Sequence, residues 1–159
     1  MKFVVSKKLI DNRTLYLSVL WMVIFLLGAL VLNGIAKGID FGMTPVMWIN
    51  TILGNEAEFI EPLLLSDLLL SLHTDLFGLI LIFILMTALL IRTSRAKGFK
   101  ITVLLLGVIT LLFYGIGLIT SLWIGRVGVI FSWGGFYLFH LLMIGIALDI
   151  FILLIRKKF

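Results

Sequence analysis

The sequence contains no cysteine, only two prolines and only two histidines among its 159 residues. The lack of cysteine excludes disulfides, thiolate metal sites, iron–sulfur clusters and a catalytic thiol. Charged residues are also scarce, at 13%, whereas 62% of the residues are hydrophobic. A soluble domain has about 25% charged residues. A chain of this size cannot hide so much apolar surface from water, so the composition predicts one membrane domain over residues 1–159.

Four apolar stretches reach the roughly 20 residues that cross about 30 Å of hydrocarbon. They cover residues 14–36, 62–91, 101–124 and 127–155. The first follows a basic segment, but it is longer than the core of a signal peptide, about 7–15 residues, so we expect it to span the membrane. These stretches predict an all-α integral membrane four-helix bundle.

Lysine and arginine residues precede the first span, join the second to the third, and follow the fourth. They are Lys2, Lys7, Lys8, Arg13, Arg92, Arg95, Lys97, Lys100, Arg156, Lys157 and Lys158. The positive-inside rule therefore predicts a multi-pass protein of the bacterial inner membrane with both termini in the cytoplasm. The net charge of +5 then reflects topology, so we expect lipid and not nucleic acid as the partner.

The predicted outer side is mainly acidic. Its charged residues are Lys37, Asp40, Glu56, Glu58, Glu61, Asp67 and Arg126. Such a loop is usually only solvated. Alternatively, it could steer a basic periplasmic redox protein, such as a cytochrome c, to the membrane surface.

The connection between the first two spans predicts a short helix. Thr44 can act as its N-cap, Pro45 can occupy its first position, and Gly54 can end it. Because the segment is apolar, we expect it to lie along the outer membrane interface with Trp48 at headgroup depth.

Small and polar residues indicate where the spans pack, because lipid gives helices no hydrophobic reason to associate. In the third and fourth spans these residues are Gly107, Thr110, Tyr114, Gly117, Ser121, Gly128, Ser132 and Gly135. Tyr114 additionally needs a hydrogen-bond partner inside the bundle, since its hydroxyl lies at membrane depth.

An ionisable side chain within a span is costly and indicates a functional site by default. His73 and His140 lie at similar depths in the second and fourth spans, which run in the same direction. Two such histidines can ligate the iron of a b-type haem in a bundle core. Trp133, Gly135 and Tyr137 would line that cofactor. Alternatively, the histidines only pack, or they contact a quinone headgroup.

Two aspartates remain within the spans. Asp75 shares a helix side with Asp67, Ser71 and Thr74, which predicts either a polar path for protons or a hydrogen-bonded helix contact. Asp75 and Tyr114 are therefore candidate proton or quinone partners. Asp149 lies near the cytoplasmic end of the fourth span, where we expect it to pair with Arg92 or Arg95.

The segments SLHTDLFG and GGFYLFHLLM, which carry the two histidines, resemble small bacterial four-helix membrane b-type cytochromes and related haem-binding membrane proteins. The resemblance implies an electron-transfer subunit with one haem b, linked to the quinone pool and to other subunits. The alternative is a cofactor-free accessory or assembly subunit of a larger membrane complex. The sequence has no phosphate-binding loop and no HExxH zinc motif, so we do not expect an autonomous enzyme.

Overall fold

The computed structural model describes residues 13–156, which form five α-helices and one short 3-10 helix. Four helices are long and apolar enough to cross a membrane: α1 (Arg13–Phe41), α3 (Leu65–Arg92), α4 (Lys97–Ile124) and α5 (Arg126–Ile155). Helices of this length extend for about 42–45 Å, which matches a bilayer with its headgroups. The predicted all-α bundle of four spans is confirmed.

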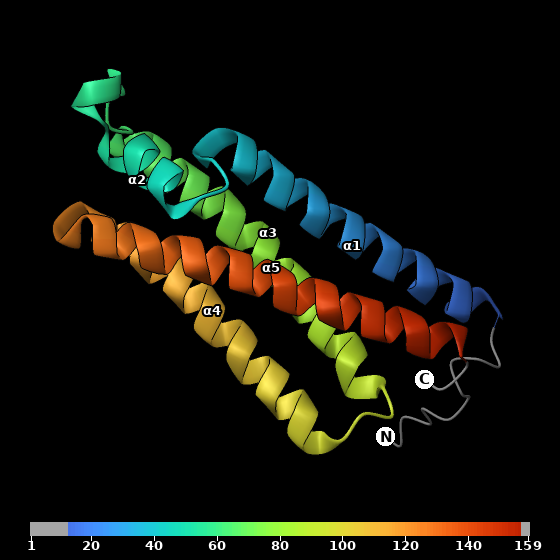
Figure 1. Cartoon of the computed structure of the whole chain (residues 1–159). Coiled ribbons are helices and arrows are strands. Elements are labelled where there is room, and N and C mark those ends of the chain that lie inside the picture. Colours follow the sequence, from blue (N-terminus) through green and yellow to red (C-terminus); the bar gives the residue numbers. More distant parts are fainter. Residues whose placement is uncertain (1–12, 157–159) are drawn as a thin grey trace.

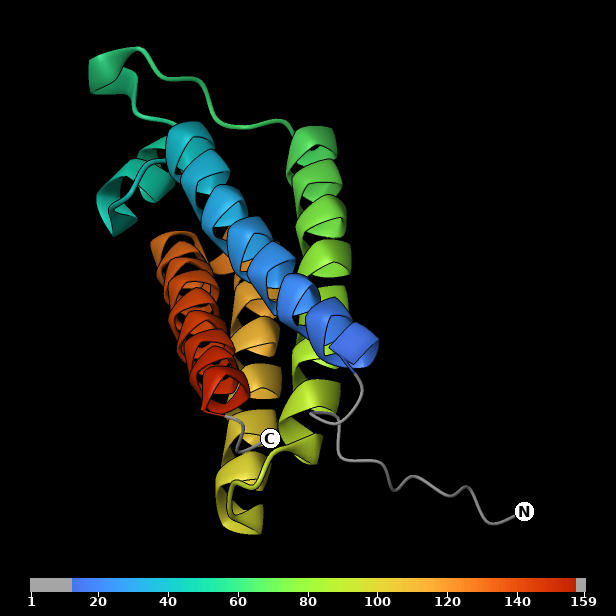
Figure 2. The same cartoon turned by 90° about the vertical axis from the view of Figure 1, so that its right-hand side faces the viewer.

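The four long helices pack side by side, and α4 and α5 make the most extensive contact (Figure 1). Helix α1 lies across α5 and touches α3 only lightly. Figure 2 shows α1 running obliquely to α3. A polar crevice lies between the two helices.

One end of the bundle holds the start of α1, the end of α3, the start of α4 and the end of α5 (Figure 1). The described basic residues at or next to these helix ends are Arg13, Arg92, Arg95, Lys97, Lys100 and Arg156. Lys2, Lys7, Lys8, Lys157 and Lys158 lie outside the described residues. The structure therefore has one basic end, as the positive-inside prediction requires.

The contact between α4 and α5 depends on glycine. A Cβ atom added to Gly135 would lie 2.5 Å from the backbone nitrogen of Tyr114, and one added to Gly117 would lie 2.6 Å from that of Ser132. The two backbones approach this closely because these positions carry no side chain. The predicted packing role of the small residues in these two spans is confirmed.

The connection from α1 to α3 contains α2 (Pro45–Leu53) and the 3-10 helix η2 (Glu56–Glu58). Thr44 caps α2, and its hydroxyl accepts a hydrogen bond from the Met47 N–H at 3.3 Å. Helix α2 ends at Gly54, whose φ of 79° is readily adopted only by glycine. The predicted helix and both of its boundary signals are confirmed.

Trp48 is fully buried against protein, and its indole N–H donates to the Gly42 carbonyl at 2.7 Å. Its depth at the headgroups stays a prediction. The ring packs on Phe41 and Phe136, with centroid distances of 5.1 and 5.8 Å. Helix α2 therefore covers the end of the bundle and seats Trp48 between α1 and α5, because protein contacts satisfy both the ring and its N–H.

An ion pair lies at the basic end of the bundle. The Arg95 guanidinium binds Asp149 through two nitrogens, with Nε 2.9 Å from Oδ2. This pair is one of the two that the sequence predicts for Asp149. The hydrogen bond to Asp149, together with its negative charge, raises the pKa of the Arg95 guanidinium above its usual value. Arg95 therefore stays charged and ties the α3–α4 connection to α5.

Candidate functional site

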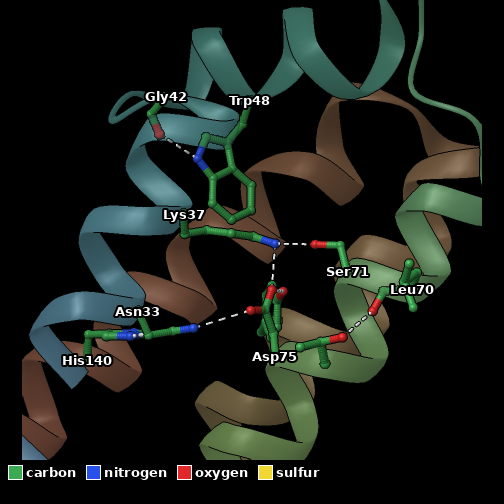
Figure 3. A network of polar contacts seen from close by, with 10 residues as sticks. Asn33, Lys37, Gly42, Trp48, Leu70, Ser71, Asp75 and His140 are labelled. Atoms are coloured by element: carbon green, nitrogen blue, oxygen red, sulfur yellow. Dashed lines mark hydrogen bonds and ion pairs between the residues drawn. The ribbon is translucent and has the colours of Figure 1, made fainter. Parts of the chain in front are cut away.

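A buried ion pair joins α1 to α3. The Nζ of Lys37 lies 2.5 Å from Oδ2 of Asp75 and donates a second hydrogen bond to the Ser71 hydroxyl at 2.6 Å (Figure 3). Only 4% of Lys37 and 9% of Asp75 are exposed. Since removing two charges from water is costly, the attraction between them and the extra hydrogen bonds must offset that cost.

Helical spacing places these groups opposite one another. Asn33 and Lys37 are four residues apart on α1, and Ser71 and Asp75 are four residues apart on α3. Residues at this spacing lie one turn apart on the same helix face. Each helix therefore contributes a short polar row, and the two rows meet side by side.

Helix α4 contacts the same carboxylate directly, and α5 is connected to it through Asn33. The Tyr114 hydroxyl of α4 donates to Asp75 Oδ2 at 2.5 Å, and the Asn33 amide donates to Asp75 Oδ1 at 3.3 Å. The amide oxygen of Asn33 lies 3.0 Å from Nε2 of His140 on α5. We call these connected residues the Asp75 cluster: Asn33, Lys37, Ser71, Asp75, Tyr114 and His140.

His140 faces two hydrogen-bond acceptors. Its Nδ1 lies 2.8 Å from the Phe136 carbonyl, and its Nε2 faces the amide oxygen of Asn33. A neutral imidazole has one donor nitrogen and one acceptor nitrogen, whereas an imidazolium has two donors. The arrangement in Figure 3 therefore satisfies His140 when both ring nitrogens carry a proton.

A second arrangement of the same side chains also satisfies every group. If the Asn33 amide turns over, its NH₂ donates to Nε2 of a neutral His140, and its oxygen accepts from a protonated Asp75. The two arrangements hold the same number of protons. They differ in whether His140 or Asp75 carries one of them.

A polar crevice of about 300 Å³ opens beside the cluster, between α1 and α3. It is lined by Asn33, Ala36, Lys37, Asp40, Asp67, Leu70, Ser71, Thr74 and Asp75. Asp40 and Asp67 are exposed, so they lie toward its mouth, whereas Asp75 is buried. The predicted polar side of the second span thus forms both a helix contact and one wall of a crevice.

The structure does not bring the two histidines together. His73 is exposed, and its position on α3 is about 160° around the helix from Asp75, which faces the bundle. His140 is buried with both ring nitrogens hydrogen-bonded. The side chains as placed do not fit a haem held between His73 and His140. Across residues 13–156, no three histidine, aspartate or glutamate side chains gather to hold a metal ion.

The other predicted cofactor residues make protein contacts. The Trp133 indole donates to the Met43 carbonyl at 3.2 Å, and the Tyr137 hydroxyl donates to the Gly42 carbonyl at 3.4 Å. Gly135 lies against the backbone of α4. These residues hold α5 to its neighbours, whereas Asp75 and Tyr114, the predicted proton partners, are in direct contact.

The sequence interpretation missed Lys37 because it ended the first span at residue 36. A signal for its position exists, since Lys37 is the only lysine or arginine between Arg13 and Arg92. An aspartate at membrane depth in the following span needs a nearby cation. Lys37, one turn beyond Asn33 on the same helix face, meets that need.

Four apolar spans joined around a buried ion pair define a multi-pass α-helical membrane protein. The chain belongs to the Aq_1264_TM family, described as a transmembrane helical domain, which it matches over residues 42–158. No curated protein and no solved structure matches it. The family match covers Asp75, Tyr114 and His140, whereas Asn33 and Lys37 come from α1, which precedes the matched region.

Proposed function

We propose that the protein is a cofactor-free accessory subunit of a larger membrane complex and that its Asp75 cluster exchanges protons with the acidic side of the membrane. The observation that carries the proposal is the placement of His140 between two acceptors, one of which is the amide that also binds Asp75. Asn33 thereby links the protonation of His140 to that of Asp75, because its amide cannot present the same atom to both.

The exchange requires water in the crevice, which Asn33 and Asp75 line, and this water must reach Nε2 of His140 beside Asn33. In one state, His140 is an imidazolium and Asp75 is a carboxylate bound to Lys37. In the other, Asp75 has taken a proton from water, His140 has returned one to water, and the amide of Asn33 has turned over. The total charge is unchanged, so the buried site changes state without gaining a net charge, which would be costly at this depth.

The remaining charged and polar neighbours favour this exchange. Lys37 and Tyr114 bind Asp75 directly, and Ser71 binds the ammonium group of Lys37, so the carboxylate stays in place while Asn33 turns. Asp40 and Asp67 lie toward the crevice mouth and attract protons and cations from the acidic side of the membrane.

Nitrogen NMR of the His140 side chain tests the proposal in the full chain reconstituted in lipid nanodiscs. We expect Asp75→Asn to change the protonation of His140 across a pH series, because the two sites share one proton through Asn33. In an Asn33→Leu background, the same Asp75→Asn change should have a much smaller effect. Glu61→Gln, which removes a carboxylate outside the crevice, is the control and should leave His140 nearly unchanged.

Infrared difference spectra provide the complementary measurement. The carbonyl stretch of a protonated carboxyl should appear as His140 loses a proton and should vanish in Asp75→Asn. If His140 responds to pH identically in the wild type and in Asp75→Asn, the cluster is only a structural clamp. Co-purification with other membrane subunits at a fixed ratio tests the accessory role separately.

Haem b and quinone binding are additional hypotheses from the sequence. A haem would require His73 and His140 to leave their present surroundings. A Soret band and a reduced α-band in the purified protein would support it, and His73→Leu should then abolish both bands. For a quinone, the candidate hydrogen-bonding groups are Lys37 and Ser71, which line the polar crevice. Quinone retained by the wild type but lost from Ser71→Ala would support that candidate.

A further inference from the structure

The loop between α2 and α3 has an ordered tip. Asn55 and Ile60 exchange backbone hydrogen bonds at 2.8 and 3.0 Å, and the Asn55 side chain accepts from the Ala57 N–H at 3.2 Å. Figure 1 shows this tip projecting beyond the start of α3. The segment is therefore a closed turn that holds the side chains at its tip in a defined orientation.

Phe59 occupies this tip in a conformation that aromatic residues rarely adopt. Its φ and ψ are 55° and 33°, in the left-handed region, and it is the only non-glycine residue with positive φ among residues 13–156. Its side chain is 95% exposed. The turn therefore holds a large apolar ring outward at a backbone position that favours glycine.

Acidic residues surround this ring. Glu56, Glu58 and Glu61 flank Phe59, and all three are exposed. Beside it lies a hollow of about 430 Å³ lined by Glu56, Phe59, Ile60, Glu61 and Pro62. The sequence has no lysine or arginine between Lys37 and Arg92, so nothing within this connection neutralises the carboxylates.

We infer that the Phe59 tip, residues Asn55 to Pro62, is a docking site for a protein that presents an apolar pocket within a positively charged surface. Aromatic side chains that fill a pocket supply much of the affinity of protein interfaces, and charges at the rim speed and orient association. The acidic rim disfavours the alternative in which Phe59 inserts into a membrane, because anionic headgroups would repel three carboxylates.

Photocrosslinking in the organism that makes the protein tests this inference. The photoreactive residue p-benzoylphenylalanine replaces Leu64, which is exposed beside the tip, and crosslinked peptides are identified by mass spectrometry. The matched control places the same residue at Phe77, which is exposed on the membrane-spanning part of α3. We expect position 64 to capture a protein through a surface rich in lysine and arginine.

Two variants distinguish docking from folding. Phe59→Gly relieves the left-handed strain, so it should keep or raise thermal stability while reducing the crosslink at least about tenfold. The triple variant E56Q/E58Q/E61Q should reduce the crosslink and remove its dependence on salt. Crosslinks to lipid alone, or a protein crosslink that Phe59→Gly leaves undiminished, would overturn the inference. Neither result depends on proton exchange at Asp75.

Discussion

Lys37 and Asp75 are 38 residues apart in the sequence, and their charged groups lie 2.5 Å apart inside the bundle. Four spanning helices contribute to the hydrogen bonds around this pair. Its two members come from α1 and α3, which otherwise touch only lightly. The ion pair therefore links two helices whose backbones approach each other closely at few points.

Removing one member of the pair should destabilise the protein more than neutralising both. Lys37→Met leaves a buried carboxylate without its cation, with an expected cost of about 3–5 kcal/mol. In Lys37→Met/Asp75→Asn, the new amide oxygen still accepts from Tyr114, so most of that loss should be recovered. Unfolding in detergent, analysed as a double-mutant cycle, measures the coupling. Additive losses would show that the pair does not act as a unit.

Adjacent glycines on α5 should respond differently to the same substitution. In Gly135→Ala, the new methyl group would meet the backbone of α4, and we expect a loss of about 1–3 kcal/mol. A Cβ on Gly134 meets no atom within 4 Å, so Gly134→Ala should be neutral or slightly stabilising because alanine favours helix. Thermal unfolding of the two variants side by side decides the point, and equal midpoints would contradict the close contact.

Because Trp48 is buried, its removal should destabilise the protein far more than the removal of an exposed tryptophan. Trp48→Ala removes a ring packed between α1 and α5 together with its hydrogen bond to Gly42, at a cost of about 3–5 kcal/mol. Trp123 is 75% exposed on α4, and Trp123→Ala should change stability by only about 0.5 kcal/mol. Chemical unfolding in the same detergent provides the comparison. A small loss of stability in Trp48→Ala would contradict the burial of this ring between α1 and α5.

The orientation in the membrane can be tested directly because the chain has no cysteine of its own. A single cysteine in Glu58→Cys should react with a membrane-impermeant maleimide applied from the side of the membrane opposite the cytoplasm. Lys97→Cys, at the basic end, should react only after the membrane is permeabilised, because the positive-inside rule places this end in the cytoplasm. The reverse labelling pattern would show that the basic end faces away from the cytoplasm.

Most of the fold could be predicted because each signal for it is local. A span is recognised from about 20 consecutive apolar residues, and α2 from Thr44, Pro45 and Gly54 within one short segment. The glycine contact between α4 and α5 was also predictable, since helical spacing alone brings those residues onto one face.

The site was less predictable because its contacts join distant residues. Asp75 and Tyr114 were recognised as polar groups at membrane depth, but the cation that pairs with Asp75 lies on another helix. The two histidines match in depth, yet depth does not determine which way a ring points around a helix axis. The exposed, left-handed conformation of Phe59 could not be predicted, because no residue pattern around it indicates that backbone angle.

The attachment between α1 and α3 also affects how the protein is made. Lys37 emerges from the ribosome before Asp75, and at 5–20 residues per second the delay is roughly 2–8 s. During that interval the Lys37 ammonium group lacks its partner on α3, and Asp40, three residues further along α1, is the carboxylate that accompanies it. Asp40 and the lipid phosphates near the surface must therefore compensate this charge until α3 arrives.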